Sequence, residues 1–266
     1  MNITTKEGQF DKAYAELKRE GYEITTTEEL AMERIKKGEK DDISQCGSYV
    51  AEAFIYLKNG DILITDRKHN PILKNPAKAT QAHEKGEEFS VSIENLKRIA
   101  QRDVKKAIIS GVLLLKRDEI KNIPVDELHI NKLSMFLLRD TARDYGKFLK
   151  DSKYKINEVP IYTVDKNYTQ KQDKPFARLL WLWSLDFGSV FVGGDRGLHG
   201  GSRVRGVRQE NFLGDLKGNK RTKVNFLQKE IYRLSNTIKG DEVRRQEVFK
   251  LIEEAEKRLQ EAKEFL

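Results

Sequence analysis

The stretch from residue 181 to residue 208 differs in composition from the rest of the chain. It contains no Lys, Glu, Gln or Met, although Lys and Glu supply 57 of the 266 residues. It also holds 7 of the 18 glycines. Ordering so many glycines has an entropic cost. Either a framework of large residues fixes the backbone here, or the stretch is a flexible loop.

Two kinds of position alternate in this stretch. Large apolar residues predict a packed framework of short strands, followed by an arginine-rich strand. The framework positions are Leu180, Trp181, Leu182, Leu185, Phe191 and Leu198, then Arg203, Val204, Arg205, Gly206, Val207 and Arg208. The residues between them share no chemistry. They are Ser184, Phe187, Gly188, Val190, Val192, Gly194, Asp195, Gly197, His199, Gly200, Gly201 and Ser202.

The pattern Leu-Trp-Leu, then short-strand residues, then Gly-Val-Arg resembles the closing segment of C-type-lectin-like and formylglycine-generating-enzyme-like domains. The alternation also resembles the variable region of target proteins of diversity-generating retroelements. In that family, template adenines are randomised, mainly at Asn codons, and the products never include Lys, Glu, Gln, Met or Trp. All twelve intervening positions obey this restriction. The same rule makes Trp181 and Trp183 fixed framework positions.

The resemblance implies a binding protein rather than an enzyme. A fixed framework would hold the backbone, and the twelve intervening residues would form the ligand-binding surface, as antibody loops do. The implied partner is an unidentified protein or glycan, with no cofactor and no metal. The resemblance also implies an origin in a virus or mobile element.

A second interpretation of the same stretch needs no variable surface. Glycine-rich loops with one apolar strand occur in many domains, where Trp181 and its neighbours would form a core strand. In that case Arg203, Arg205 and Arg208 are solvated charges on an edge strand, or they bind a phosphate among glycine amides.

Hydrophobic periodicity predicts an α+β protein in three regions. Residues 1–125 form a helix-rich N-terminal region with one β-hairpin. Residues 126–210 form a second region, which the resemblance implies is lectin-like, with the variable segment at residues 180–208. Residues 211–266 form a C-terminal helical hairpin or coiled coil, which would pack on the main domain or join copies into a homo-oligomer. The hairpin is predicted at Asn59, Gly60 and Asp61, which accept the backbone of a tight turn between two apolar runs.

Shorter patterns predict the remaining elements. Helices are expected from residue 10 to residue 19, and over residues 28–37 after a Thr cap. Residues 75–89 predict a loop or frayed helix. Single helices are expected over residues 93–107 and 133–149, with Asp126 as a cap before the second. Strands are expected at residues 112–117 and 159–164, and a polar linker at residues 165–174.

The charge of the chain suggests an alternative function, the binding or processing of nucleic acid. The formal net charge is +8, yet residues 1–180 carry 33 basic and 29 acidic groups, so the excess is spread along the sequence. A nucleic-acid-binding protein needs this excess on one face. Asp61, Asp66 and Lys68 also suggest a Mg²⁺-dependent nucleic-acid-processing site, in which carboxylates bind the metal and the lysine steadies a water.

Other residues restrict the classes of protein to which the chain can belong. Cys46 is the one cysteine, so no internal disulfide forms, and it is expected to be a buried structural thiol. The four histidines lack the spacing of a zinc site. No apolar run is long enough for a membrane span, and the first twenty residues contain no signal-peptide core. We therefore expect no membrane association, and a cytoplasmic or virion-associated protein.

Overall fold

The computed structural model describes residues 2–189, 191–192, 198 and 202–208. The chain divides into two units, Met1–Arg208 and Gln209–Leu266. The predicted C-terminal helical hairpin, residues 211–266, lies outside the described residues. All that follows concerns the first unit.

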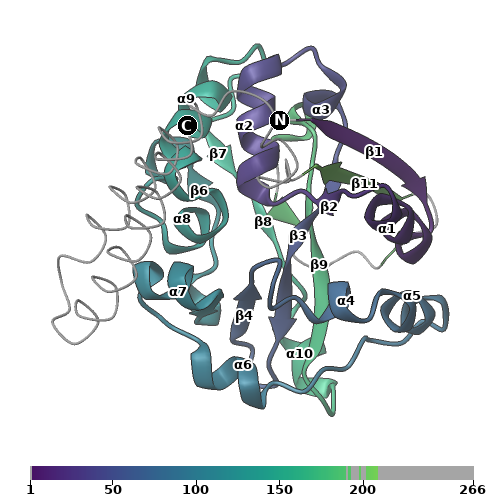
Figure 1. Ribbon diagram of the computed structural model, residues 1–266. Coiled ribbons are helices and arrows are strands. Elements are labelled where there is room, and N and C mark those ends of the chain that lie inside the picture. Colours follow the sequence, from purple (N-terminus) through teal and green to yellow (C-terminus); the bar gives the residue numbers. More distant parts are fainter. Residues whose placement is uncertain (1, 190, 193–197, 199–201, 209–266) are drawn as a thin grey trace, which may run out of the picture. The chain divides into compact units, whose positions relative to one another are not determined.

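A nine-stranded sheet forms the centre of this unit (Figure 1). Its main path runs β1, β11, β3, β9, β10 and β8, while β2 pairs with β11 and β4 joins β3 to β5. A separate two-stranded sheet contains β6 and β7. The strands are β1 (Ile3–Gly8), β2 (Glu23–Ile24), β3 (Ser48–Tyr56), β4 (Ile62–Thr65), β5 (Val112–Leu115), β6 (Ile123–Pro124), β7 (Glu158–Val159), β8 (Ile161–Tyr162), β9 (Phe176–Leu182), β10 (Phe191–Val192) and β11 (Ser202–Val207).

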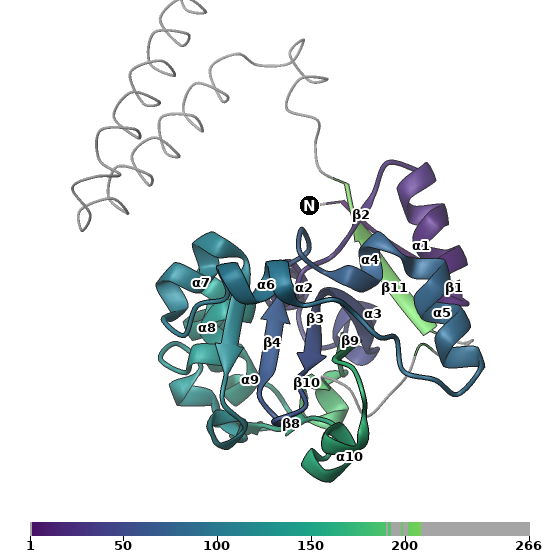
Figure 2. The ribbon, with the colours of Figure 1, turned by 90° about the horizontal axis from the view of Figure 1, so that it is seen from below.

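Helices pack on both faces of the sheet, as Figures 1 and 2 show from two directions. Residues of α2, α7, α8 and α9 bury one face, and residues of α1, α4, α5 and α6 bury the other. The helices are α1 (Phe10–Arg19), α2 (Thr27–Lys37), α3 (Asp42–Gln45), α4 (Pro71–Lys74), α5 (Pro76–Glu84), α6 (Glu94–Ile99), α7 (Val104–Ser110), α8 (Lys132–Leu138), α9 (Ala142–Asp151) and α10 (Lys166–Lys171). No helix in the described ranges combines the length and apolarity needed to span a bilayer.

Several local predictions are confirmed. Helix α1 buries its apolar side, and α2 begins after Thr26, whose hydroxyl accepts a bond from the Glu29 N–H in a capping box. Strands β3 and β4 form the predicted antiparallel hairpin. Gly60 in its turn has a φ of +90°, which glycine adopts without steric strain.

The predicted helix over residues 93–107 is instead two helices, α6 and α7. Between them the Gln101 N–H donates to the carbonyl of Val112, and the Gln101 carbonyl accepts from Leu114, at 3.0 and 2.8 Å. This pairing with β5 takes the backbone out of the helix. Asp103 then caps α7 by accepting from the Lys106 N–H.

The predicted helix over residues 133–149 is also divided, into α8 and α9. Arg139 between them has a φ of +48°, which interrupts regular helical hydrogen bonding. The expected cap Asp126 is also wrong, because the side chain of Asn131 accepts the N–H groups at the start of α8. Residues 165–174 are not a plain linker, since Asp165 caps the short helix α10 there. The stretch 75–89, predicted as a loop or frayed helix, contains α5.

Sequence patterns did not predict strand β1, which pairs antiparallel with β11 from Ile3↔Val207 to Gly8↔Ser202. Together with the pairing of β3 and β9, this places strands from both sides of residue 125 in one sheet. The expected boundary between residues 125 and 126 therefore runs through a single compact unit.

Candidate ligand-binding face

A row of aromatic side chains leads from the core to the surface of the sheet. Phe10 of α1 contacts Tyr49 of β3, with ring centroids 5.7 Å apart. Tyr49 contacts Trp181 of β9 at 4.8 Å, and Trp181 contacts Trp183 at 5.9 Å. Trp183 contacts Phe187 at 4.8 Å. The exposed fraction rises from 0% at Phe10 to 61% at Phe187, so the row ends at the surface within the predicted variable segment.

A second exposed aromatic residue lies on the same face. Trp181 pairs with Val192 of β10, and Val192 pairs with Tyr162 of β8. Residues paired across strands project to the same side of a sheet, so Tyr162 shares the face of Trp181. Tyr162 is 54% exposed. We name Trp181, Trp183, Phe187 and Tyr162 the aromatic face.

Gly47 fixes the position of the innermost indole. A Cβ atom at Gly47 would lie 2.6 Å from Trp181 Nε1. The indole therefore lies directly against the backbone that leads into β3. Among the described residues, no group accepts a hydrogen bond from the buried Trp181 Nε1. Trp181 is thus positioned by close packing rather than by a polar contact.

The structure places the predicted ligand-binding residues unevenly. Phe187 is exposed and Gly188, half-buried, ends the 3₁₀ turn η4 (Leu185–Phe187) in a left-handed conformation. Ser184 is only 3% exposed, so its side chain is not available to a ligand. Val192 lies in β10 and Ser202 begins β11. The other predicted positions lie outside the described residues: Val190, Gly194, Asp195, Gly197, His199, Gly200 and Gly201.

The predicted apolar framework is buried. Its members are at most 8% exposed, apart from the half-buried Trp181: Leu180, Leu182, Leu185, Phe191, Leu198, Val204 and Val207. Leu198 packs in the core cluster of α1 and Tyr49. This contact anchors the segment to the core between its two outer strands.

The arginines of β11 are not all solvated edge charges, because β11 lies between β1 and β3. Arg205 is 2% exposed and donates to Asp42 Oδ2 at 2.9 Å. Its burial lowers the pKa of its guanidinium. Arg203 also pairs with Asp42, at 3.0 Å. Beside them Cys46 is half-buried, and burial raises the pKa of its thiol.

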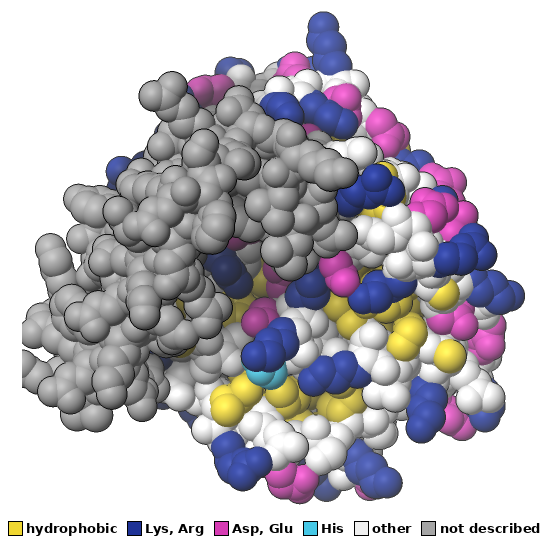
Figure 3. Space-filling view, in the orientation of Figure 1, with side chains coloured by type: hydrophobic (Ala, Val, Ile, Leu, Met, Phe, Trp, Pro, Cys, Tyr) yellow, Lys and Arg dark blue, Asp and Glu magenta, His cyan; other side chains and the backbone are white. Residues whose placement is uncertain are grey.

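The residues of the alternative Mg²⁺ site are not brought together. Asp61 precedes β4 and Asp66 follows it, so the four-residue strand separates them by about 16 Å. Asp61 pairs with Lys116 Nζ at 2.7 Å, and Asp66 pairs with His69 Nδ1 at 2.8 Å. Within the described ranges, no three His, Cys, Asp or Glu side chains cluster as metal ligands. Figure 3 shows basic and acidic side chains interspersed on the visible face, without one large basic patch.

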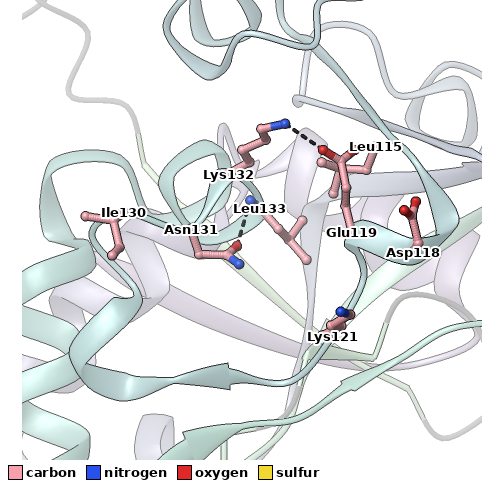
Figure 4. Close-up of a pocket in the computed structure, with 8 residues that line it drawn as sticks. All are labelled: Leu115, Asp118, Glu119, Lys121, Ile130, Asn131, Lys132 and Leu133. Atoms are coloured by element: carbon pink, nitrogen blue, oxygen red, sulfur yellow. Dashed lines mark hydrogen bonds and ion pairs between the residues drawn. The ribbon is translucent and has the colours of Figure 1, made fainter.

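A pocket of about 440 Å³ lies at the start of α8 (Figure 4). None of its lining residues belongs to the aromatic face. It is lined by Leu115, Asp118, Glu119, Lys121, Ile130, Asn131, Lys132 and Leu133. Glu119 is already paired with Lys132 Nζ at 2.6 Å and accepts the Lys116 N–H. The pocket shares no residue with the predicted variable segment.

Two neighbouring substitutions test which predicted positions face outward. We expect Phe187→Ser to change the free energy of unfolding by less than about 0.5 kcal/mol, because the ring is exposed. We expect Ser184→Phe to lower it by about 2 kcal/mol, because a large ring must enter packed space. Urea unfolding followed by circular dichroism measures both. Equal effects would contradict this assignment of the two side chains.

Sequence patterns missed three residues that shape this face: Gly47, Tyr49 and Tyr162. Tyr162 carried a weak signal, since it lies in the predicted strand over residues 159–164. Gly47 and Tyr49 carried none, because their role depends on contact with Trp181 from a distant strand.

Comparisons with known proteins give one similar structure. No protein-family model and no curated protein matches the sequence. One solved structure is similar, with a TM-score of 0.56. It comes from work on how the C-type lectin fold accommodates massive sequence variation in Nanoarchaeota. It is 17% identical, and the match covers 78% of this chain and 98% of that one. At this identity the likeness concerns the fold alone, and the described unit of this protein has a C-type-lectin-like fold of mixed helices and strands.

Proposed function

We propose that this protein binds a protein or glycan ligand through the aromatic face and the predicted variable residues between positions 187 and 202. The binding surface would be diversified by a retroelement, as in the variable proteins that the sequence resembles. One observation carries the proposal. The stretch without Lys, Glu, Gln or Met includes the point where the aromatic row reaches the surface, at Phe187.

The division between framework and surface suits such a role. The apolar framework residues between Leu180 and Val207 are buried, so they would hold the strands in place whatever the exposed positions carry. Exposed aromatic side chains provide large contact areas at a low cost in conformational entropy. Trp183 and Tyr162 are outside the predicted variable set, so they would provide a constant part of the contact surface. Phe187 and its variable neighbours would then determine which ligand is bound.

The neighbouring DNA provides the first test. A retroelement origin requires a nearby reverse-transcriptase gene and a near-copy of the sequence that encodes residues 180–208. The two copies should differ only at template adenines, and the differences should fall at the predicted positions other than the buried Ser184. A neighbourhood without a reverse transcriptase, or differences spread evenly over all four bases, would contradict the retroelement part of the proposal.

A pair of displayed libraries tests binding itself. One library randomises Phe187, Val190 and Val192, and a matched library randomises the buried residues Ser184, Leu185 and Phe191. We expect most members of the first library to fold and to yield binders to several unrelated proteins and glycans. We expect most members of the second to be lost before selection. A first library that folds but yields no binder would contradict the proposed function.

A further inference from the structure

A fully buried arginine contacts the turn that carries Phe187. Arg34 of α2 is 0% exposed. Its Nε donates to the Ile43 carbonyl at 2.9 Å, and its Nη1 donates to the Tyr145 hydroxyl at 3.0 Å. Its Nη1 also reaches Ser189 Oγ at 3.4 Å. The guanidinium thereby joins α2, α9 and the turn between η4 and β10.

The charge of Arg34 is compensated by neutral oxygens alone. No carboxylate of a described residue lies within 4.0 Å of it, and its bonds go to carbonyls and hydroxyls. A buried charge is strongly destabilising unless hydrogen-bond acceptors replace its lost hydration. Each acceptor around Arg34 is therefore held in place, including the hydroxyls of Tyr145 and Ser189, which share a bond of 2.6 Å.

Ser189 has a backbone conformation that requires such support. Its φ is +54°, in the left-handed region that serine rarely adopts. Its side chain is fully buried, and its N–H donates to the Ser184 carbonyl at 3.1 Å. The Gly188 N–H donates to the Leu185 carbonyl at 2.9 Å, which closes the turn. The position of the Phe187 ring against Trp183 depends on this closed turn.

From these contacts we infer that Arg34 is a positioning residue that acts through Tyr145 and Ser189 to fix the turn of residues 184–189. The inference rests on the proposed function in one respect: the position of this turn matters for ligand contact because the proposed ligand binds at Phe187. Ser189 is then a framework residue inside the variable-looking stretch. Phe187 can change without disturbing the turn, because its side chain takes no part in the network.

Three variants remove one member of the network each: Arg34→Lys, Tyr145→Phe and Ser189→Ala. Lysine keeps the charge but cannot bond several acceptors in the fixed geometry of a guanidinium. Tyr154→Phe is the matched control, because it also removes one hydroxyl near α3, where Tyr154 contacts Gln45. The full chain is used for all four variants.

Hydrogen exchange gives a measurement that needs no ligand. We expect the amides of Gly188 and Ser189 to exchange at least about tenfold faster in the three network variants. Acrylamide should also quench tryptophan fluorescence more strongly, since both tryptophans of the chain lie in the aromatic row. Tyr154→Phe should match the wild type in both measurements.

The outcomes separate this inference from the proposed function. Unchanged exchange and quenching in Tyr145→Phe and Ser189→Ala would overturn the inference, whatever the libraries yield. If both variants loosen the turn while the libraries yield no binder, the positioning role stands and the binding role fails. Should Arg34→Lys fail to fold, the other two variants still decide the matter, because each removes a single hydroxyl.

Discussion

Substituting Gly47 by alanine should lower the free energy of unfolding by about 2 kcal/mol and the melting temperature by about 5 °C. The new methyl group would lie 2.6 to 2.7 Å from three atoms of the Trp181 indole. The backbone of Gly47 is outside the left-handed region, so alanine meets no conformational strain there. The indole must therefore move, and with it the aromatic row. Thermal and urea unfolding measure the loss, and the tryptophan emission spectrum reports the movement.

A second substitution at the contact serves as the control. Trp181→Phe removes the atoms that the methyl group would meet, so we expect Gly47→Ala to cost much less in that background. The two substitutions should then be non-additive, as expected for residues in direct contact. A full and additive loss in the double variant would show that the cost arises elsewhere. A Gly47→Ala protein with an unchanged melting temperature would contradict the packing described above.

The free energy of unfolding should fall as the pH rises from about 4.5 to about 7, and Glu52→Gln should remove much of this fall. Glu52 lies where the register of β3 is interrupted, and its carboxyl accepts from the Thr27 N–H and hydroxyl. Burial raises the pKa of Glu52 from 4.5 to about 7, which outweighs the lowering effect of the Thr27 bonds. Neutral glutamic acid is thus favoured in the folded protein.

The sign of the effect follows from proton binding. The folded protein holds this proton more tightly than the unfolded chain, so the stabilisation is complete below pH 4.5 and is lost as the pH passes 7. A shift of this size corresponds to about 3 kcal/mol. At pH 8 the Glu52→Gln protein should be the more stable one, because glutamine keeps a neutral acceptor for Thr27. Guanidinium unfolding from pH 5 to pH 8.5 measures this.

The exposed residue Glu87 provides a matched control. Glu87→Gln removes the same charge at the surface, and its stability should follow the wild-type pH dependence. If the wild type and Glu52→Gln show the same pH dependence, the buried carboxyl does not titrate in this range.

Elements that depend on interactions between residues close in sequence could be predicted from the sequence. Helix α1 follows from apolar residues at helical spacing, and the hairpin of β3 and β4 follows from the turn at Gly60. The burial of framework residues such as Leu185 and Phe191 follows from their size and apolarity. These patterns involve interactions within a few residues, so composition and spacing are enough to identify them.

Helix ends were predicted less well where a distant strand competes for the backbone. Gln101 lies within a helical pattern, yet its N–H and carbonyl pair with β5. The chain gains two strand hydrogen bonds there in place of helical ones. No local pattern at residues 93–107 reveals that partner.

The predicted binding residues show more clearly that local sequence patterns do not reveal distant contacts. Ser184 and Phe187 are three residues apart and obey the same codon restriction, but one is buried and the other is exposed. The turn η4 decides this difference, and the buried contacts of Ser189 with Arg34 and Tyr145 hold that turn. Arg205 is a third example of this limit. Its strand, β11, was expected at the edge of the sheet, but β11 pairs with β1 and therefore lies in the interior of the sheet.

The sequence by itself determined the mixture of helices and strands, the hairpin, the buried framework and the unusual composition of residues 181–208. Only the tertiary structure decided that β1 pairs with β11, that the aromatic row ends at Phe187, and that Arg34 reaches the turn beside it. The physical reason is the range of the interactions. Turns, caps and apolar periodicity act between near neighbours, whereas strand pairing and side-chain packing join residues up to about two hundred positions apart.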